Sequence, residues 1–270
     1  MTAEKSDSNK NKDSSKASPL GGGLEGVVDL NCDMGEGLDT DASIMPFISS
    51  ANIACGYHAG DEKTIWQTIE LAIKYHVAIG AHVSFYDKEN FGREEINLSE
   101  KDIYELVEQQ LIIFKEIADA FDIKINHIKP HGALYNMSAK NAAIAKAIAQ
   151  SVKDFDPGLI LFGLSGSHSL HEAKAIGLKT AGEVFADRTY QDDGSLTPRS
   201  QPGALIENSH QAIQQVLQMV KEKTVIGVSG KTIPIAAQTV CIHGDGKHAV
   251  EFAKDIFETL KQHSIDIKAL

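Results

Sequence analysis

In the stretch Val27-Val28-Asp29-Leu30-Asn31-Cys32-Asp33, apolar and polar residues alternate from Val28 onward, and the stretch ends at a carboxylate. In an extended strand residues two apart point to the same side, so Asp29, Asn31 and Asp33 share one face. Six further strand-like runs also stop at polar residues, namely Cys55-Gly56-Tyr57-His58, His82, Lys129-Pro130-His131, Ser165, Glu183 and His243-Gly244-Asp245. The carboxyl ends of parallel strands open onto one face, so this placement predicts an active site there.

Short apolar runs alternate with helical patterns from Val27 onward, which is typical of repeated βα units. We expect strands at 27–31, 51–55, 78–82, 125–129, 159–164, 179–184, 236–242 and, shorter, at 264–267. We expect helices at 61–75, 99–121, 139–153, 168–176, 204–221 and 246–262. Asp61 and the Ser99/Asp102 pair are placed to cap two of these helices. Seven to eight mostly parallel strands predict an α/β fold, an irregular (β/α) barrel, in preference to an open doubly wound sheet.

Composition predicts one large domain with a polar tail. With 270 residues, 42% of them hydrophobic, the chain can bury a barrel-sized core. We expect a single catalytic domain over residues 26–270. Residues 1–25 are rich in Ser, Lys, Asp and Asn, and we expect them to form a disordered tail because they offer little apolar surface to bury.

The charge balance limits the partners that we expect. A formal charge of −11 argues against nucleic acid and anionic membranes, which require clustered Lys and Arg. No apolar run approaches the roughly 20 residues of a membrane helix, and no signal peptide begins the chain. Three cysteines cannot all pair, which favours a reducing compartment. We therefore expect a cytoplasmic protein with small-molecule or protein partners; whether it forms a homo-oligomer stays open.

The polar residues of the first strand suit several kinds of chemistry. Two carboxylates and an amide facing one cavity could bind a hard cation, act as a general base or orient a water molecule. Alternatively, Asn31 and Asp33 could bond backbone amides in a turn around Gly35 and Gly37. We favour a functional role, because an inward-facing Asp29 within an apolar strand is costly without a partner.

Three imidazoles at strand ends, those of His58, His82 and His131, could bind a metal or transfer protons, and the pattern leaves both roles open. Each taken singly could instead be a structural residue. Cys55 lies three residues before His58, but a thiolate nucleophile is the weaker interpretation because apolar neighbours raise the pKa of a thiol.

Lys129 and Glu183 are further candidates for catalysis. A lysine that enters a cavity can stabilise an oxyanion or a phosphoryl group, or it can form an ion pair with Asp29 or Glu183. Glu183 could be an acid or base with a raised pKa, or part of a structural salt bridge. Two long loops, 83–98 and 185–203, are expected to form lids or substrate walls. We assign substrate binding to Arg93, Asp187, Arg188, His243 and Asp245.

Seven stretches carry a resemblance to a known family: Asp29-Leu30-Asn31, 50–61, Gly80-Ala81-His82, Phe91-Gly92-Arg93, 127–136, 183–188 and 241–245. In order and spacing they resemble the LamB/YcsF family, whose members are known as the A subunit of 5-oxoprolinase, from about Val27 to the carboxyl terminus. The resemblance implies an irregular barrel of the glycoside hydrolase and deacetylase kind. It also implies ATP-dependent hydrolysis of 5-oxo-L-proline to L-glutamate, in a complex with subunits B and C.

The chemistry implied by this resemblance suits the candidate residues. ATP, as a co-substrate, could activate the lactam oxygen before water attacks the ring carbon. Two alternatives stay open: a metal-dependent amide or acetyl hydrolase that acts alone, and a non-catalytic lactam-binding subunit. No nucleotide-binding glycine loop follows a strand, so ATP is expected to be handled largely by the partners.

Overall fold

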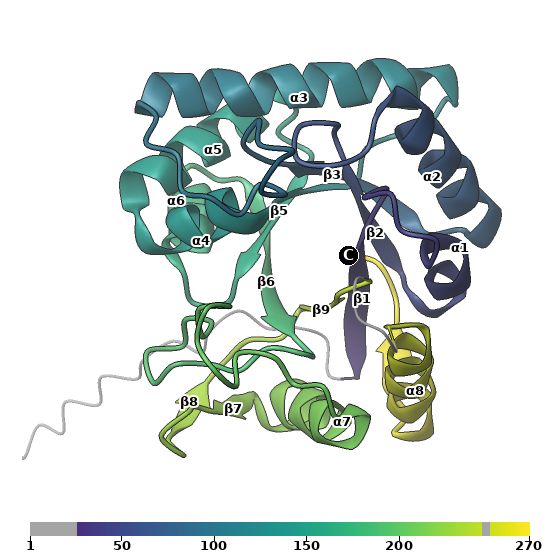
Figure 1. Ribbon diagram of the computed structural model, residues 1–270, viewed down its shortest axis with the longest axis vertical. Helices are drawn as coiled ribbons and strands as arrows, with labels where there is room; N and C mark the ends of the chain where they lie inside the picture. The colour runs from purple at the N-terminus through teal and green to yellow at the C-terminus, as the bar shows by residue number, and fades with distance from the viewer. Residues whose placement is uncertain (1–25, 245–248) are drawn as a thin grey trace, which may run out of the picture.

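The fold is a closed barrel of parallel strands wrapped by helices (Figure 1), in a computed structural model that describes residues 26–244 and 249–270. The predicted tail 1–25 and the candidate Asp245 lie outside the described residues. Around the barrel the order is β1-β2-β3-β4-β5-β6-β9, and pairing of β1 with β9 closes it. The strands are β1 (Val27–Met34), β2 (Ser50–Ala54), β3 (Ala78–Val83), β4 (His127–Pro130), β5 (Ile160–Leu164), β6 (Lys179–Phe185) and β9 (Thr239–Ile242).

The expected irregular (β/α) barrel is therefore confirmed, and its seven strands match the predicted runs to within a few residues. The last predicted strand exists as β10 (Asp266–Ile267), which pairs in parallel with the start of β1. One hairpin was not predicted: β7 (Thr224–Ile226) pairs antiparallel with β8 (Thr232–Pro234) outside the barrel.

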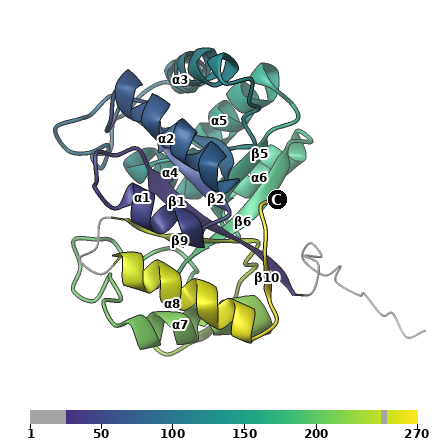
Figure 2. The same ribbon diagram turned by 90° about the vertical axis from the view of Figure 1, so that its right-hand side faces the viewer.

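The helices cover the outside of the barrel, as the two ribbon views show (Figures 1 and 2). Asp61 accepts a bond from the Thr64 amide at 2.8 Å and caps α2, while Ser99 and Asp102 form the expected capping box of α3. The elements are α1 (Asp41–Ile44), the 3-10 turn η1 (Met45–Phe47), α2 (Glu62–Tyr75), α3 (Glu100–Ala120), α4 (Gly132–Lys140), α5 (Ala142–Phe155), α6 (His168–Ala175), α7 (Ser209–Leu217), the π-helical turn η2 (Gln218–Glu222) and α8 (Ala249–Gln262).

Two helix predictions need correction. The helix expected at 139–153 is α5, which begins at Ala142 because the Asn141 side chain caps its first amides, and the preceding helix α4 was not predicted. The helix expected at 204–221 begins only at Ser209, where Asn208 caps it. The start of the helix expected at 246–262 lies partly outside the described residues.

The apolar core lies between the strands and the helices. On β1, Val28, Leu30, Cys32 and Met34 are fully buried in this layer, while the alternate polar residues point into the barrel. Among the described residues, no helix is both long and apolar enough to cross a membrane.

Candidate active site

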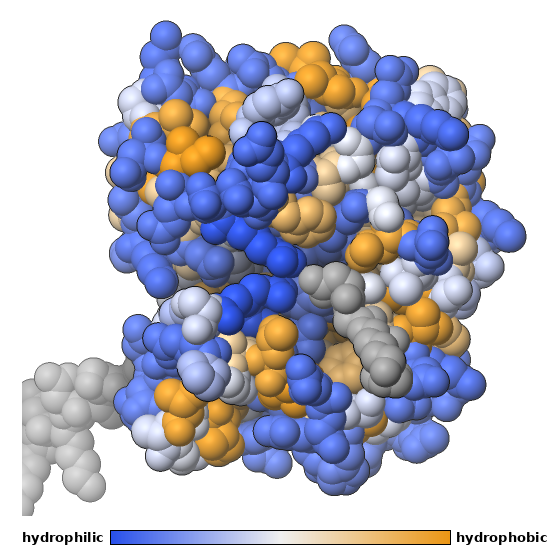
Figure 3. All heavy atoms as spheres, in the orientation of Figure 1, coloured by the Kyte–Doolittle hydropathy of each residue, from blue (hydrophilic) through white to orange (hydrophobic). Residues whose placement is uncertain are grey.

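A cavity of about 940 Å³ opens at the carboxyl ends of the strands. Asp33, His82, Lys129 and His131 lie at its floor, and hydrophilic side chains surround the hollow near the centre of Figure 3. Both long loops contribute to its wall, with Arg93 from the first and Arg188 and its neighbours from the second. Residues of both loops therefore line the cavity, which is the position expected of substrate walls. Other lining residues include Tyr135, Leu164, Ser165, Phe185, Arg199 and His243.

Asp29 lies beneath this cavity, fully buried in the barrel interior. Its carboxylate accepts hydrogen bonds from the hydroxyls of Ser49 at 2.6 Å, Ser50 at 2.7 Å and Thr239 at 2.5 Å. Burial raises the pKa of Asp29 to about 6, although these three hydroxyls oppose the shift. Three neutral hydroxyl donors are thus the partners that compensate for the burial of Asp29. Asp29 itself does not line the cavity.

Asn31 and Asn52 join the deep layer to the cavity floor. The Asn31 amide donates to Glu183 Oε1 at 3.0 Å, and its oxygen accepts from Asn52 Nδ2 at 2.7 Å. Asn52 also donates to Asp33 Oδ1 at 2.8 Å, and its oxygen lies 2.8 Å from Nε2 of His127. The side chains of Asn31 and Asp33 therefore bond other side chains, rather than the backbone amides of a turn.

Lys129 is buried at the centre of the floor. Its ammonium lies 2.8 Å from Asp33 Oδ1 and 2.8 Å from Glu183 Oε1, with Cys241 Sγ at 3.1 Å. Burial disfavours its charge, but the carboxylate of Asp33 and the neighbouring Cys241 and Glu183 raise the pKa of Lys129 well above its usual value. Asp29 and Glu183 were the two carboxylates considered as ion-pair partners of this lysine. The pair with Glu183 is present, and the second pair is with Asp33 instead of Asp29.

His82 and His131 are held by backbone carbonyls. Nδ1 of His82 lies 2.9 Å from the Lys129 carbonyl, and Nε2 of His131 lies 2.9 Å from the Phe91 carbonyl. A carbonyl only accepts, so each of these nitrogens carries the proton in the neutral ring. The other two nitrogens lie 2.9 Å apart, close enough to share a proton in a hydrogen bond, and Asp33 Oδ2 lies 3.3 Å from that of His82.

Glu36 and His58 complete this cluster. Glu36 Oε1 lies 3.1 Å from Nε2 of His58, 3.5 Å from Nδ1 of His131 and 4.0 Å from Nε2 of His82. The His58 ring stacks on His131 with centroids 3.8 Å apart. Burial first, and then the nearby charge of His82, lowers the pKa of His58 to about 2, and burial likewise lowers the pKa of His131. Neutral imidazoles beside carboxylates can bind a metal or accept protons.

Two groups of side chains are close enough to hold a metal ion. Ligand atoms of Glu36, His58, His82 and His131 lie within 4.8 Å of one another, which includes all three imidazoles predicted as candidates. The second group is Asp33, Cys241 and His243. The Lys129 ammonium already contacts Asp33 and Cys241, so its positive charge disfavours a cation there. The first group is the better candidate.

Three of the predicted substrate-binding residues, Arg93, Arg188 and His243, line the upper wall of the cavity, and Asp187 contacts His243. His243 pairs with Asp187 at 2.8 Å, and the buried Arg188 donates to the carbonyls of Thr197 at 2.6 Å and Ala204 at 3.4 Å. Burial and then the like charge of Arg199 lower the pKa of Arg188 to about 10.

Several residues of this network were missed by sequence reasoning. Glu36 follows β1 between two glycines with positive φ, and no pattern singled it out. Asn52 and His127 are polar residues inside strands, a signal that was available but unused. Cys241 was not singled out either; it is buried and burial raises its pKa, yet its sulfur contacts Lys129.

The fold and this site define a β/α-barrel protein in which carboxylates, imidazoles and a buried lysine meet at the carboxyl ends of the strands. The model of the LamB/YcsF family matches residues 28–270, and the chain belongs to this family. It is 50% identical over 248 residues to the 5-oxoprolinase A subunit of Tolumonas auensis, covering 90% of this chain and 99% of that protein. The Staphylococcus aureus MRSA252 protein of the same name is 48% identical with the same coverage.

A solved structure shares the fold over almost the whole barrel. The lactam utilization protein from Thermus thermophilus superimposes with a TM-score of 0.85 at 38% identity, covering 90% of this chain and 100% of that one. The expectation of membership in the LamB/YcsF family is thereby confirmed.

Proposed function

We propose that the chain is the A subunit of a 5-oxoprolinase and opens the ring of 5-oxo-L-proline to give L-glutamate. One observation carries this proposal: stretches that are far apart in sequence but typical of the family meet at one cavity floor, where Asp33, Lys129 and Glu183 form a buried charge network. The relatives named above have this activity in their names and match nearly their whole length. ATP is the co-substrate, and subunits B and C are the partners.

The residues at the floor suit the opening of a lactam. A lactam has a stabilised carbonyl and a poor amine leaving group, so ATP would activate the oxygen before water attacks the carbon. We assign water activation and proton transfer to Asp33 with His58, His82 and His131. Lys129 lies at the floor to stabilise charge that develops on oxygen, with Glu183 holding its ammonium in place.

The upper wall suits the carboxylate of the substrate or a phosphoryl group. Arg188 is a buried guanidinium that donates its hydrogen bonds to backbone carbonyls, so it retains its positive charge in the cavity wall. Arg93 lies in the same wall. For Asp29 and Asn31 the contacts support a structural contribution beneath the site, so we do not assign them the role of base.

The partners would handle ATP, since the sequence contains no phosphate-binding glycine loop after a strand. Tight binding of ATP to the isolated chain would count against this division of labour. The cytoplasmic location and any homo-oligomer stay predictions.

The test is an assay of glutamate release from 5-oxo-L-proline with ATP, using this chain alone and reconstituted with subunits B and C. We expect turnover only in the complete assembly and only with ATP. Glutamate formed by the chain alone without ATP would favour the stand-alone hydrolase. Turnover by B and C without this chain would remove it from the reaction.

The cluster of Glu36, His58, His82 and His131 favours a second candidate function, a metal-dependent amide or acetyl hydrolase. A divalent cation held there by the carboxylate and imidazoles would supply Lewis-acid activation of water or of the carbonyl. Metal analysis of the purified chain, and of His131→Gln as its ligand-deficient variant, tests this candidate. Metal at well under one equivalent per chain, with activity insensitive to chelators, would exclude it.

A non-catalytic lactam-binding subunit is the remaining alternative. In that case alanine at His82 or His131 would change the affinity for the lactam while turnover at saturating substrate stayed intact. We expect the opposite, a fall in turnover.

A further inference from the structure

Asp187 and His243 form a second acid–imidazole pair, separate from the three-histidine cluster, in which His243 lines the cavity. Asp187 follows β6 and His243 follows β9, and these strands are neighbours in the barrel. Nδ1 of His243 lies 2.9 Å and 2.8 Å from the two carboxylate oxygens of Asp187. The imidazole stacks on Phe185 with ring centroids 5.6 Å apart and 18° between the planes. The ring is thus held in one orientation by a carboxylate and an aromatic face.

The carboxylate determines which nitrogen of His243 faces the reaction. An ionised carboxylate only accepts hydrogen bonds, so Nδ1 keeps its proton and Nε2 is the nitrogen that exchanges one. His243 lines the cavity, and its hydrogen bonds to Asp187 are made through Nδ1 alone. Burial opposes the charge of Asp187, but His243 and the arginines Arg199 and Arg188 lower its pKa, which keeps it ionised.

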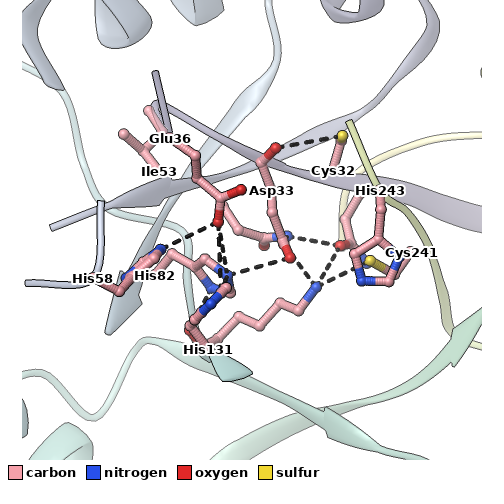
Figure 4. A network of polar contacts seen from close by, with 12 residues as sticks. Cys32, Asp33, Glu36, Ile53, His58, His82, His131, Cys241 and His243 are labelled. Atoms are coloured by element: carbon pink, nitrogen blue, oxygen red, sulfur yellow. Dashed lines mark hydrogen bonds and ion pairs between the residues drawn. The ribbon is translucent and has the colours of Figure 1, made fainter. Parts of the chain in front are cut away.

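The pair lies across the cavity floor from the other histidines. In Figure 4, His58, His82 and His131 lie on one side of Asp33, and His243 with Cys241 lies on the other. The Lys129 ammonium, at 2.8 Å from Asp33 and 3.1 Å from Cys241, connects the two sides. A carbonyl carbon placed above Lys129 would therefore have imidazoles on both sides.

We propose that His243 is the general acid that protonates the ring nitrogen of the lactam, and that Asp187 is its positioning residue. This inference rests on the proposed function and assigns a role beyond substrate binding to the pair. Water adds its oxygen to the carbonyl carbon and gives one proton to the three-histidine side. The bond between carbon and nitrogen then breaks, its electron pair stays on nitrogen, and Nε2 of His243 delivers a proton to that nitrogen. This ring opening consumes one water. The phosphoryl group that ATP transfers to the carbonyl oxygen leaves as inorganic phosphate when a second water hydrolyses the resulting acyl phosphate, and ADP is the other product.

The division into two sides has a physical reason. An amine anion is too basic to leave unprotonated, so proton delivery must accompany cleavage of the bond between carbon and nitrogen. His82 and His131 contact each other through ring nitrogens 2.9 Å apart, beside Glu36, an arrangement suited to accepting protons or binding a cation. His243 instead has a carboxylate of its own, at 2.8 Å, and stands apart from that cluster.

The test compares variants in the reconstituted assembly with 5-oxo-L-proline and ATP. His243→Gln should lower kcat by about 100-fold to 10⁴-fold and leave KM within about threefold, since general acid–base catalysis contributes that much. Asp187→Asn, which keeps the shape but not the charge, should lower kcat by about tenfold or more, again with little change in KM. Arg188→Gln should instead raise KM, as a charge-holding residue. His263→Gln is the matched control, because this histidine is exposed beyond α8.

The outcomes separate the possible roles. A His243→Gln assembly that keeps its kcat, whether KM rises or not, overturns the proposal in favour of substrate holding or no role. Should His243→Gln fail to fold by circular dichroism, Asp187→Asn decides by the same criterion. A wild-type assembly that releases no glutamate refutes the proposed function itself, and this is visible before any variant is measured.

Discussion

Asp29 and Asp33 lie on the same strand and the same face, yet their surroundings are opposite. Asp29 is surrounded by neutral hydroxyl donors and burial raises its pKa to about 6. Asp33 is also buried although it lines the cavity, and the charges of His82 and Lys129 overcome the effect of burial and lower its pKa well below its usual value. One strand thus carries a structural layer beneath the site and a charged layer that faces the cavity.

This difference shows that a carboxylate inside a barrel is not by itself a catalytic group. The neutral donors around Asp29 satisfy its oxygens without providing a charge for chemistry. Around Asp33 the partners are themselves ionisable, so a proton moved at one group changes the free energy of the others. We therefore expect substitutions in the deep layer to lower stability and those in the charged layer to lower turnover as well.

The largest effect is expected at Lys129. Lys129→Met removes the ammonium between Asp33 and Glu183 and leaves buried carboxylates unpaired, which should lower the free energy of unfolding by about 3–5 kcal/mol. Urea denaturation measures this. The control Lys115→Met breaks an exposed pair with Asp119 and should cost less than about 1 kcal/mol. Equal stability of the two variants would show that the buried ion pairs do not stabilise the site.

The next effect concerns turnover at His82. His82→Gln removes the imidazole that contacts both His131 and Asp33, so glutamate release by the assembly should fall by about 100-fold or more. Thr239→Val, in the deep layer, should leave turnover of the folded protein within about tenfold. A similar fall in both would mean that the two layers do not differ in function.

Stability should depend on pH through Asp29. Its pKa is about 6 in the folded protein and 3.8 as an isolated group, so the folded state binds this proton more tightly than the unfolded chain does. The resulting stabilisation is complete below pH about 3.8 and is lost as the pH rises through about 6. The shift corresponds to about 3 kcal/mol.

Asp29→Asn removes this titration. We expect the free energy of unfolding of the wild type, minus that of the variant, to fall by up to about 3 kcal/mol between about pH 4 and about pH 7. Chemical denaturation across this range measures the difference. A difference that does not change with pH would contradict the raised pKa.

The smallest effect is expected at Ser50. Ser50→Ala removes one of three hydroxyl donors to Asp29, and the loss of one buried hydrogen bond should cost about 1–3 kcal/mol, nearer the lower value because two donors remain. Thermal unfolding is sufficient to detect it. Unchanged stability would indicate that water replaces the hydroxyl.

The sequence predicted which face the polar residues of β1 occupy, because alternation in a strand is a local property. Their depth could not be predicted, since it depends on register: Asp29 pairs with Thr239, whereas Asn31 pairs with Cys241. Seven strand ends were predicted because apolar runs stop there. Which of those ends touch one another depends on closure of the barrel, and no local pattern contains that information.

The missed elements have particular reasons. The hairpin of β7 and β8 consists of two three-residue strands, which are too short for a periodicity signal. The helix expected at 139–153 began three residues too early, because the start of α5 is set by the side chain of Asn141, which caps its first amides. Glu36 lies in the loop after β1, and its position beside the histidines depends on the path of that loop, which no local sequence pattern predicts.

The most direct test of the difference between the two layers is the turnover of Asp29→Asn and Asp33→Asn, each in the same reconstituted assembly and at a temperature where both are folded. We predict that Asp33→Asn lowers glutamate release by about 100-fold or more, while Asp29→Asn keeps it within about tenfold of the wild type. Equal loss in the two variants, or a greater loss for Asp29→Asn, would contradict the assignment of chemistry to the layer of Asp33.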